Sequence, residues 1–182
     1  MNYNQFTIKS QEAIQKAGEI ANAFQNQSVE NLHLLKGILS VDENVVPYLL
    51  KKNNVSVEKV LSATEQKLYA LPKVSGGEQF LSNDTTRALQ KATDYSKAMK
   101  DEFVSLEHLL LGILSVNDQA SQILNDQGVT ENDLKTAIRQ LRQGSTVKSQ
   151  TAEETYHALS KYARNLNDLA MDGKLDPVIG RD

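Results

Sequence analysis

An internal repeat is the feature that most constrains this chain of 182 residues. Residues 29–41 return as residues 104–116, and nine of the thirteen positions are identical. The correspondence continues upstream at the same offset of 75 and downstream at an offset of 74, so that one duplicated unit covers residues 6–142. Two copies predict a pseudo-symmetric pair, because a solenoid needs about three or more units.

Each copy is predicted to contain four helices. In the first copy Ala13, Ile14 and Ala17 begin an apolar face with the spacing of a helix, and no segment shows the sustained polar and apolar alternation of a strand. The sequence therefore predicts an all-α fold of two four-helix repeats. The expected helices are 7–25, 31–41, 44–53 and 56–70, then 82–100, 105–115, 118–127 and 130–142.

Residues at the expected helix ends support the duplication independently of residue identity. Gly128 suits a left-handed helix end, and the matching residue of the first copy is Asn54, the other residue type that tolerates this conformation. Ser56 and Thr130 follow as expected N-caps of the last helix in each copy.

The composition changes after the second copy. Residues 143–150 are small and polar, which predicts a flexible linker that spans about 15 Å as a random coil. Thr151 and Glu154 have the spacing of a capping box, so a further helix is expected to open a segment that looks cut from a larger protein. The expected organisation is a repeat domain at 1–142 (repeats at about 6–70 and 80–142), a linker at 143–150, and the truncated start of another module at 151–182.

Charge and composition exclude several functions. The formal net charge is −3, whereas nucleic-acid binders need a basic excess or a basic stripe. The chain has no Cys, which rules out disulfides, a thiolate nucleophile and a Cys-based zinc site. It shows neither a signal peptide nor an apolar run of membrane-spanning length. We therefore expect a cytoplasmic protein with no nucleic-acid or membrane partner.

The sequence offers little support for catalysis. His33 and His108 occupy the same place in the two copies, but no third group is spaced to orient either ring, so each is expected to bond a group near a helix start. A hydrolase that uses His108 and Glu107 is the weakest hypothesis. Gly37 and Gly112, also equivalent, are expected to permit close helix contact.

The candidates for binding are apolar residues of the second copy at places where a core does not need them. Asp101 and Glu107 lie near them in sequence, which predicts an apolar groove rimmed by carboxylates. Such a groove would suit unfolded segments with apolar side chains and occasional positive charge. The alternative is that these residues simply close the core of the second unit. The apolar candidates are Phe80, Leu81, Leu89 and Phe103.

The repeated cores at 32–39 and 107–114, together with the closing segment 173–182, resemble the Clp family of AAA+ chaperones. The first 142 residues are similar to its amino-terminal repeat domain, and the closing segment is similar to the opening of its first ATPase module. Leu32 favours the disaggregating branch, because protease-linked members often carry Glu there.

The resemblance implies a substrate-binding amino-terminal module of an ATP-dependent disaggregase or unfoldase. Such a module captures exposed apolar segments of unfolded or aggregated polypeptides, which a homohexameric ring then threads. The full-length protein would use ATP and Mg and cooperate with the DnaK chaperone system through a middle domain absent here. With no Walker sequences, this fragment is expected to be no enzyme and to hold no cofactor or metal.

The resemblance also suggests roles for individual positions. Thr7, Asp101 and Glu107 match polar positions near the peptide-binding face, with Leu81 and Leu89 in its groove, and Val178 and Ile179 match adenine contacts of the full-length protein. The alternative function within the family is an adaptor-docking domain of a protease-linked Clp unfoldase.

Overall fold

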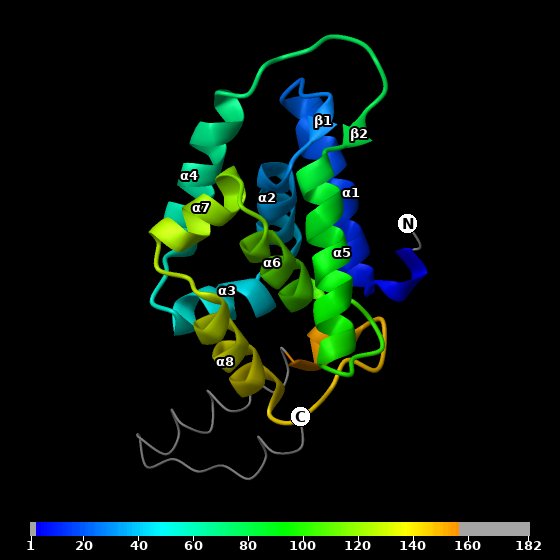
Figure 1. Ribbon diagram of the computed structural model, residues 1–182, viewed down its shortest axis with the longest axis vertical. Helices are drawn as coiled ribbons and strands as arrows, with labels where there is room; N and C mark the ends of the chain where they lie inside the picture. The colour runs from blue at the N-terminus through cyan, green and yellow to red at the C-terminus, as the bar shows by residue number, and fades with distance from the viewer. Residues whose placement is uncertain (1–2, 157–182) are drawn as a thin grey trace.

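The computed structural model describes residues 3–156, and the all-α prediction is confirmed (Figure 1). Every helix lies within two residues of its expected ends. A short 3₁₀ turn, η1 (Tyr3–Gln5), precedes the first helix. The first repeat contains α1 (Ile8–Ala23), α2 (Asn31–Val41), α3 (Val45–Lys52) and α4 (Val57–Tyr69), and the second contains α5 (Asn83–Ala98), α6 (Leu106–Ser115), α7 (Gln119–Asp126) and α8 (Glu131–Arg142).

The helix ends form as their residue types predict. Asn54 and Gly128 both adopt the left-handed conformation, with φ of 59° and 95°. The Ser56 hydroxyl accepts a hydrogen bond from the Lys59 amide at 3.3 Å, which caps α4. The Thr130 hydroxyl caps the equivalent helix α8 in the same way.

The two repeats share a single core. The central helices α2 and α6 pack against α1 and α5 of their own repeats, and they also contact each other (Figure 1). The smaller helices cross between repeats, because α3 packs on α8 and α4 packs on α7. Because both repeats supply the buried apolar residues, neither repeat encloses a core of its own.

Two equivalent glycines allow the central helices to approach their neighbours. A Cβ atom at Gly37 would lie 2.7 Å from the carbonyl oxygen of Ala13. A Cβ atom at Gly112 would overlap the carbonyl oxygen of Ala88. The predicted role of both glycines in close helix contact is confirmed.

The expectation of no strands is wrong at one short pairing. Strand β1 (Ser28–Val29) pairs in parallel with β2 (Phe80–Leu81), and an isolated parallel bridge joins Phe6 to Val104. The pairings are related by the offset of 75, so the segment before the first helix of each repeat pairs with the other repeat. Two-residue strands are too short to produce an alternating pattern, which is why the sequence shows no sign of them.

Residues 143–156 lie against the helical domain. The Val147 side chain is buried, its amide donates to Asp101 Oδ1 at 3.0 Å, and its carbonyl accepts from the Glu102 amide at 2.8 Å. Residues 152–156 are helical, and Tyr156 is also buried. The flexibility of the predicted linker at 143–150 and the domain boundaries around it stay predictions.

Candidate functional site

A buried group of charged side chains lies where α8 meets the start of α6. Arg142, at the end of α8, places Nη1 2.8 Å from Asp101 Oδ2 and donates from Nε to Glu107 Oε2 at 3.2 Å. His108 Nε2 lies 2.7 Å from the same Asp101 oxygen. Burial alone would raise the pKa of Asp101, but hydrogen bonds from His108 and from the Val147 amide, with the charge of Arg142, lower it overall. The Asp101 carboxyl is therefore ionised and internally paired.

The equivalent place in the first repeat holds an uncharged group. Asn26, Leu32 and Leu68 stand there in the positions of Asp101, Glu107 and Arg142. His33 Nδ1 accepts from the Glu30 amide at 2.8 Å and Nε2 bonds Asn26 Oδ1 at 2.9 Å, while burial lowers the pKa of His33 to about 4. The prediction that both histidines bond groups near helix starts is confirmed, since His108 Nδ1 accepts from the Ser105 amide.

Glu153 joins the charged group from the segment that follows α8. Its Oε2 accepts from the Thr7 hydroxyl at 2.6 Å and from the Leu106 amide at 3.1 Å. Burial, with the nearby charge of Glu107, raises the pKa of Glu153 to about 7. Thr7, which also caps α1, and Glu153 thus connect the start of the chain to residues 152–156.

The expected carboxylate rim is corrected by the structure, because Asp101 and Glu107 are buried and face Arg142. Leu89 is also fully buried, within the common core. Thr7 is buried as well and bonds Glu153. The four side chains that make internal contacts are therefore those of Thr7, Leu89, Asp101 and Glu107. Their contact with a client stays a prediction.

The remaining predicted residues lie at two separate places. Phe80 is 54% exposed and Leu81 is half-buried, both before α5, whereas the half-buried Phe103 follows it. A helix of 16 residues is about 24 Å long, so the structure does not gather Phe80 and Phe103 into one groove. Val178 and Ile179 lie outside the described residues, so their contact with ATP stays a prediction.

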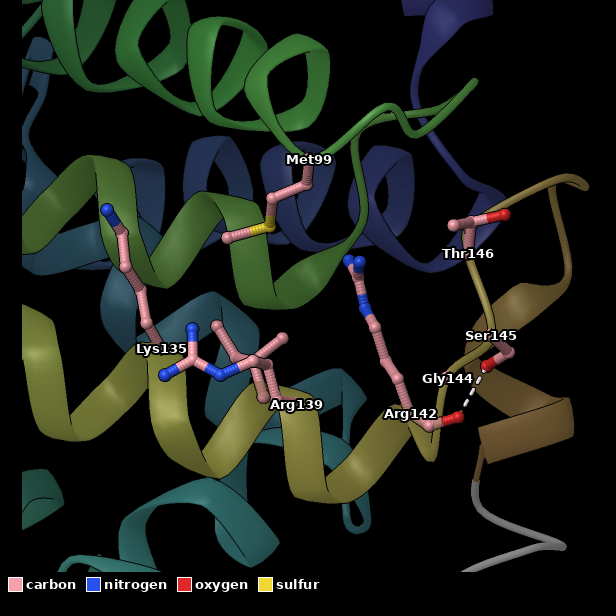
Figure 2. Close-up of a pocket in the computed structure, with 8 residues that line it drawn as sticks. Met99, Lys135, Arg139, Arg142, Gly144, Ser145 and Thr146 are labelled. Atoms are coloured by element: carbon pink, nitrogen blue, oxygen red, sulfur yellow. Dashed lines mark hydrogen bonds between the residues drawn. The ribbon is translucent and has the colours of Figure 1, made fainter.

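A pocket of about 370 Å³ opens at the far end of α5, beside the charged group (Figure 2). Met99 and Ile138 supply its apolar lining, and residues 144–146 close one side. Lys135 and Arg139 line the pocket from α8, and Figure 2 shows the Arg139 guanidinium turned toward Lys135. Sequence reasoning missed this pocket, because Met99 is far in sequence from α8.

Residues 3–156 offer neither a metal-binding cluster nor a membrane-spanning helix. Within residues 3–156 no group of three or more His, Asp or Glu side chains is placed to hold a metal ion. Among the helices of the same range, none has the length and apolar character needed to cross a membrane.

Comparison with known proteins defines the class. Residues 5–127 match the Clp repeat (R) N-terminal domain, and the chain belongs to this family. Its N-terminal domain fold is shared by the Hsp104 N-terminal domain from Candida albicans, with a TM-score of 0.71 and 23% identity over 81% of this chain and 98% of that one.

The curated relatives point to one kind of Clp chaperone. The chain is 50% identical over all of its 182 residues to Chaperone protein ClpB of Bacteroides thetaiotaomicron, and 48% identical over all of them to Chaperone protein ClpB of Porphyromonas gingivalis. The aligned part is 21% of each relative, so the chain spans about a fifth of their length. The predicted membership of the Clp chaperone family is confirmed.

Proposed function

We propose that this chain is the substrate-binding amino-terminal module of an ATP-dependent protein disaggregase, which captures exposed apolar segments of aggregated polypeptides. The observation that carries this proposal is the alignment of all 182 residues with proteins named Chaperone protein ClpB. The proposal includes a cytoplasmic location and, for the full-length protein, a homohexameric ATPase ring that uses ATP and Mg and works with the DnaK chaperone system.

An exposed apolar strip supports client capture. Tyr69, Val74 and Phe80 are 67%, 45% and 54% exposed, and all three lie along residues 24–28. The Tyr69 ring packs 5.2 Å from that of Phe24, while the amides of Val74 and Phe80 donate to carbonyl oxygens at positions 25 and 27. Large exposed apolar side chains that border one segment of the chain are suited to bind apolar partners.

An adaptor-docking domain of a protease-linked Clp unfoldase is the alternative. It predicts binding to a folded adaptor instead of unfolded polypeptides. Leu32 and the names of the relatives both favour the disaggregase.

The test is an NMR titration of the 182-residue chain with a permanently unfolded polypeptide. We expect weak binding with shifts along the strip. A Phe80→Ser variant should bind about fivefold more weakly, because burying a half-exposed Phe side chain against a client contributes about 1 kcal/mol of binding free energy. Ile8→Ser is the matched control, since Ile8 is 46% exposed but lies at the other end of α1. Shifts confined to residues 143–150, or equal losses in both variants, would count against the proposal.

A further inference from the structure

The pocket between α5 and α8 combines an apolar lining with a rim of one charge sign. Its side-chain lining holds three basic residues and no acidic residue, although the whole chain has a net charge of −3. The pocket beside Asn31, by comparison, is lined by Glu30, Asp84 and Asp118. The basic lining thus distinguishes this pocket from the one beside Asn31.

The three basic residues differ in how far they are already paired. Arg142 is saturated by Asp101 and Glu107 inside the protein. Lys135 lies 3.0 Å from Glu131 and 5.3 Å from the centre of the Tyr95 ring, so its charge is partly balanced. Among residues 3–156, the exposed Arg139 side chain donates to the Thr136 hydroxyl alone, at 3.2 Å, which leaves most of its donors available.

The size and lining of the pocket limit what it can hold. A volume of about 370 Å³ is at the small end of ligand pockets, which is room for one or two side chains. Met99 is unbranched and polarisable, so it can adapt to aliphatic or aromatic groups of different shape. Arg139 lines the same pocket, and its guanidinium can bind a carboxylate next to such a group through paired donors.

We propose that this pocket is a second client subsite, which binds a polypeptide segment carrying an Asp or Glu next to a large apolar residue. This inference rests on the proposed function. It adds to it a preference for an acidic neighbour. The strip of Tyr69, Val74 and Phe80 lies beyond the opposite end of α5, and the two lysines beside it are already engaged, because Lys36 pairs with Glu65 and Lys73 donates to the Phe24 carbonyl oxygen. A client that reaches both places must be extended over about the length of that helix, about 24 Å.

The experiment compares three short peptides of the same apolar content, in which one residue beside Leu is Asp, Asn or Lys. Binding to the 182-residue chain is measured by fluorescence polarisation at low salt and mapped by NMR. The Asp peptide should bind about fivefold more tightly than the Lys peptide, the upper end for an exposed ion pair, with shifts at Met99 and Gly144. The difference should shrink as salt is added.

Charge reversal on the rim supplies the variant. Arg139→Glu should remove the preference for the Asp peptide, while Lys59→Glu should leave it intact, because Lys59 is an exposed residue in the first turn of the equivalent helix α4, about 15 Å along that helix from Tyr69. Circular dichroism of both variants checks that they fold. Equal binding of the three peptides, or equal effects of the two reversals, would overturn the subsite and leave client capture standing. No binding of any peptide would refute both.

Discussion

The buried charges around Arg142 lead to a prediction about stability. Replacing Arg142 by Leu, the residue at the equivalent position 68 of the first repeat, removes the cation that faces both Asp101 and Glu107. Both carboxylates have fully buried side chains, so two charges would lose their partner. Breaking a buried ion pair from one side costs about 3–5 kcal/mol. For a domain of this size that loss corresponds to about 10 °C in Tm.

The first repeat suggests how the loss should be reversed. The triple variant Asp101→Asn, Glu107→Leu and Arg142→Leu reproduces the uncharged arrangement of Asn26, Leu32 and Leu68. Because well-packed apolar residues replace buried ion pairs at little or no cost, the triple variant should lie within about 1.5 kcal/mol of the wild type.

Urea denaturation followed by circular dichroism at pH 7 measures all three proteins. Arg139→Leu, one turn earlier on α8 and exposed, is the control and should change the free energy of unfolding by about 0.5 kcal/mol or less. A loss below about 1 kcal/mol for Arg142→Leu would refute the reasoning, since it would mean that the carboxylates need no buried cation. A triple variant no more stable than the single one would refute the equivalence of the two sites.

Three further predictions follow from single residues. Burial raises the pKa of Glu153 to about 7 when residues 143–156 are docked, so the contribution of Glu153 to docking is present below its ordinary pKa of 4.5 and is lost as pH rises through about 7. The protection of the Val147 amide from exchange, relative to the intrinsic rate at each pH, should therefore fall between pH 6 and 8, and it should fall less in Glu153→Gln. Gly112→Ala should lower the free energy of unfolding, measured by urea denaturation, by about 2–3 kcal/mol, because the added Cβ meets backbone atoms. Gly76→Ala, at a φ of 80° in open space, should lower it by about 1 kcal/mol, and equal losses in the two variants would contradict this. The pKa of His33, lowered to about 4 by burial, predicts that unfolding takes up a proton and stability falls as pH drops from about 6.5 to 4, and an NMR titration showing the ring to titrate near 6.5 would disprove it.

The helices could be predicted from the sequence because their signals are local. Apolar spacing marks the faces, and residues such as Asn54, Ser56 and Thr130 mark the ends. The short parallel pairings could not be predicted in this way. They join segments 52 and 98 residues apart, as with Val29–Leu81 and Phe6–Val104, and only the packed helices bring these segments together.

The candidate site was predicted less well than the fold. Asp101 and Glu107 looked like solvated residues beside an apolar groove, and nothing near them in sequence indicates that Arg142 is their partner. A signal was nevertheless present in the repeat. Where the second copy has three charged residues, the first has Asn26, Leu32 and Leu68, and such a concerted difference indicates that the three positions touch. The pocket at Met99 had no comparable signal.

The reciprocal pairing of Phe6 with Val104 and of Leu81 with Val29 bears on how a duplicated chain of this kind can arise. The segment before the first helix of each repeat pairs with the other repeat. A half-length chain on its own would therefore leave this segment unpaired, and it would also leave unpaired the strand edge that binds the same segment of the other repeat. Two identical half-length chains, by contrast, could satisfy both edges at once by exchanging their leading segments around a twofold axis. Joining two such genes end to end would turn that exchanged dimer into one polypeptide, and the second copy would then be free to acquire its charged triad while the first kept an uncharged one.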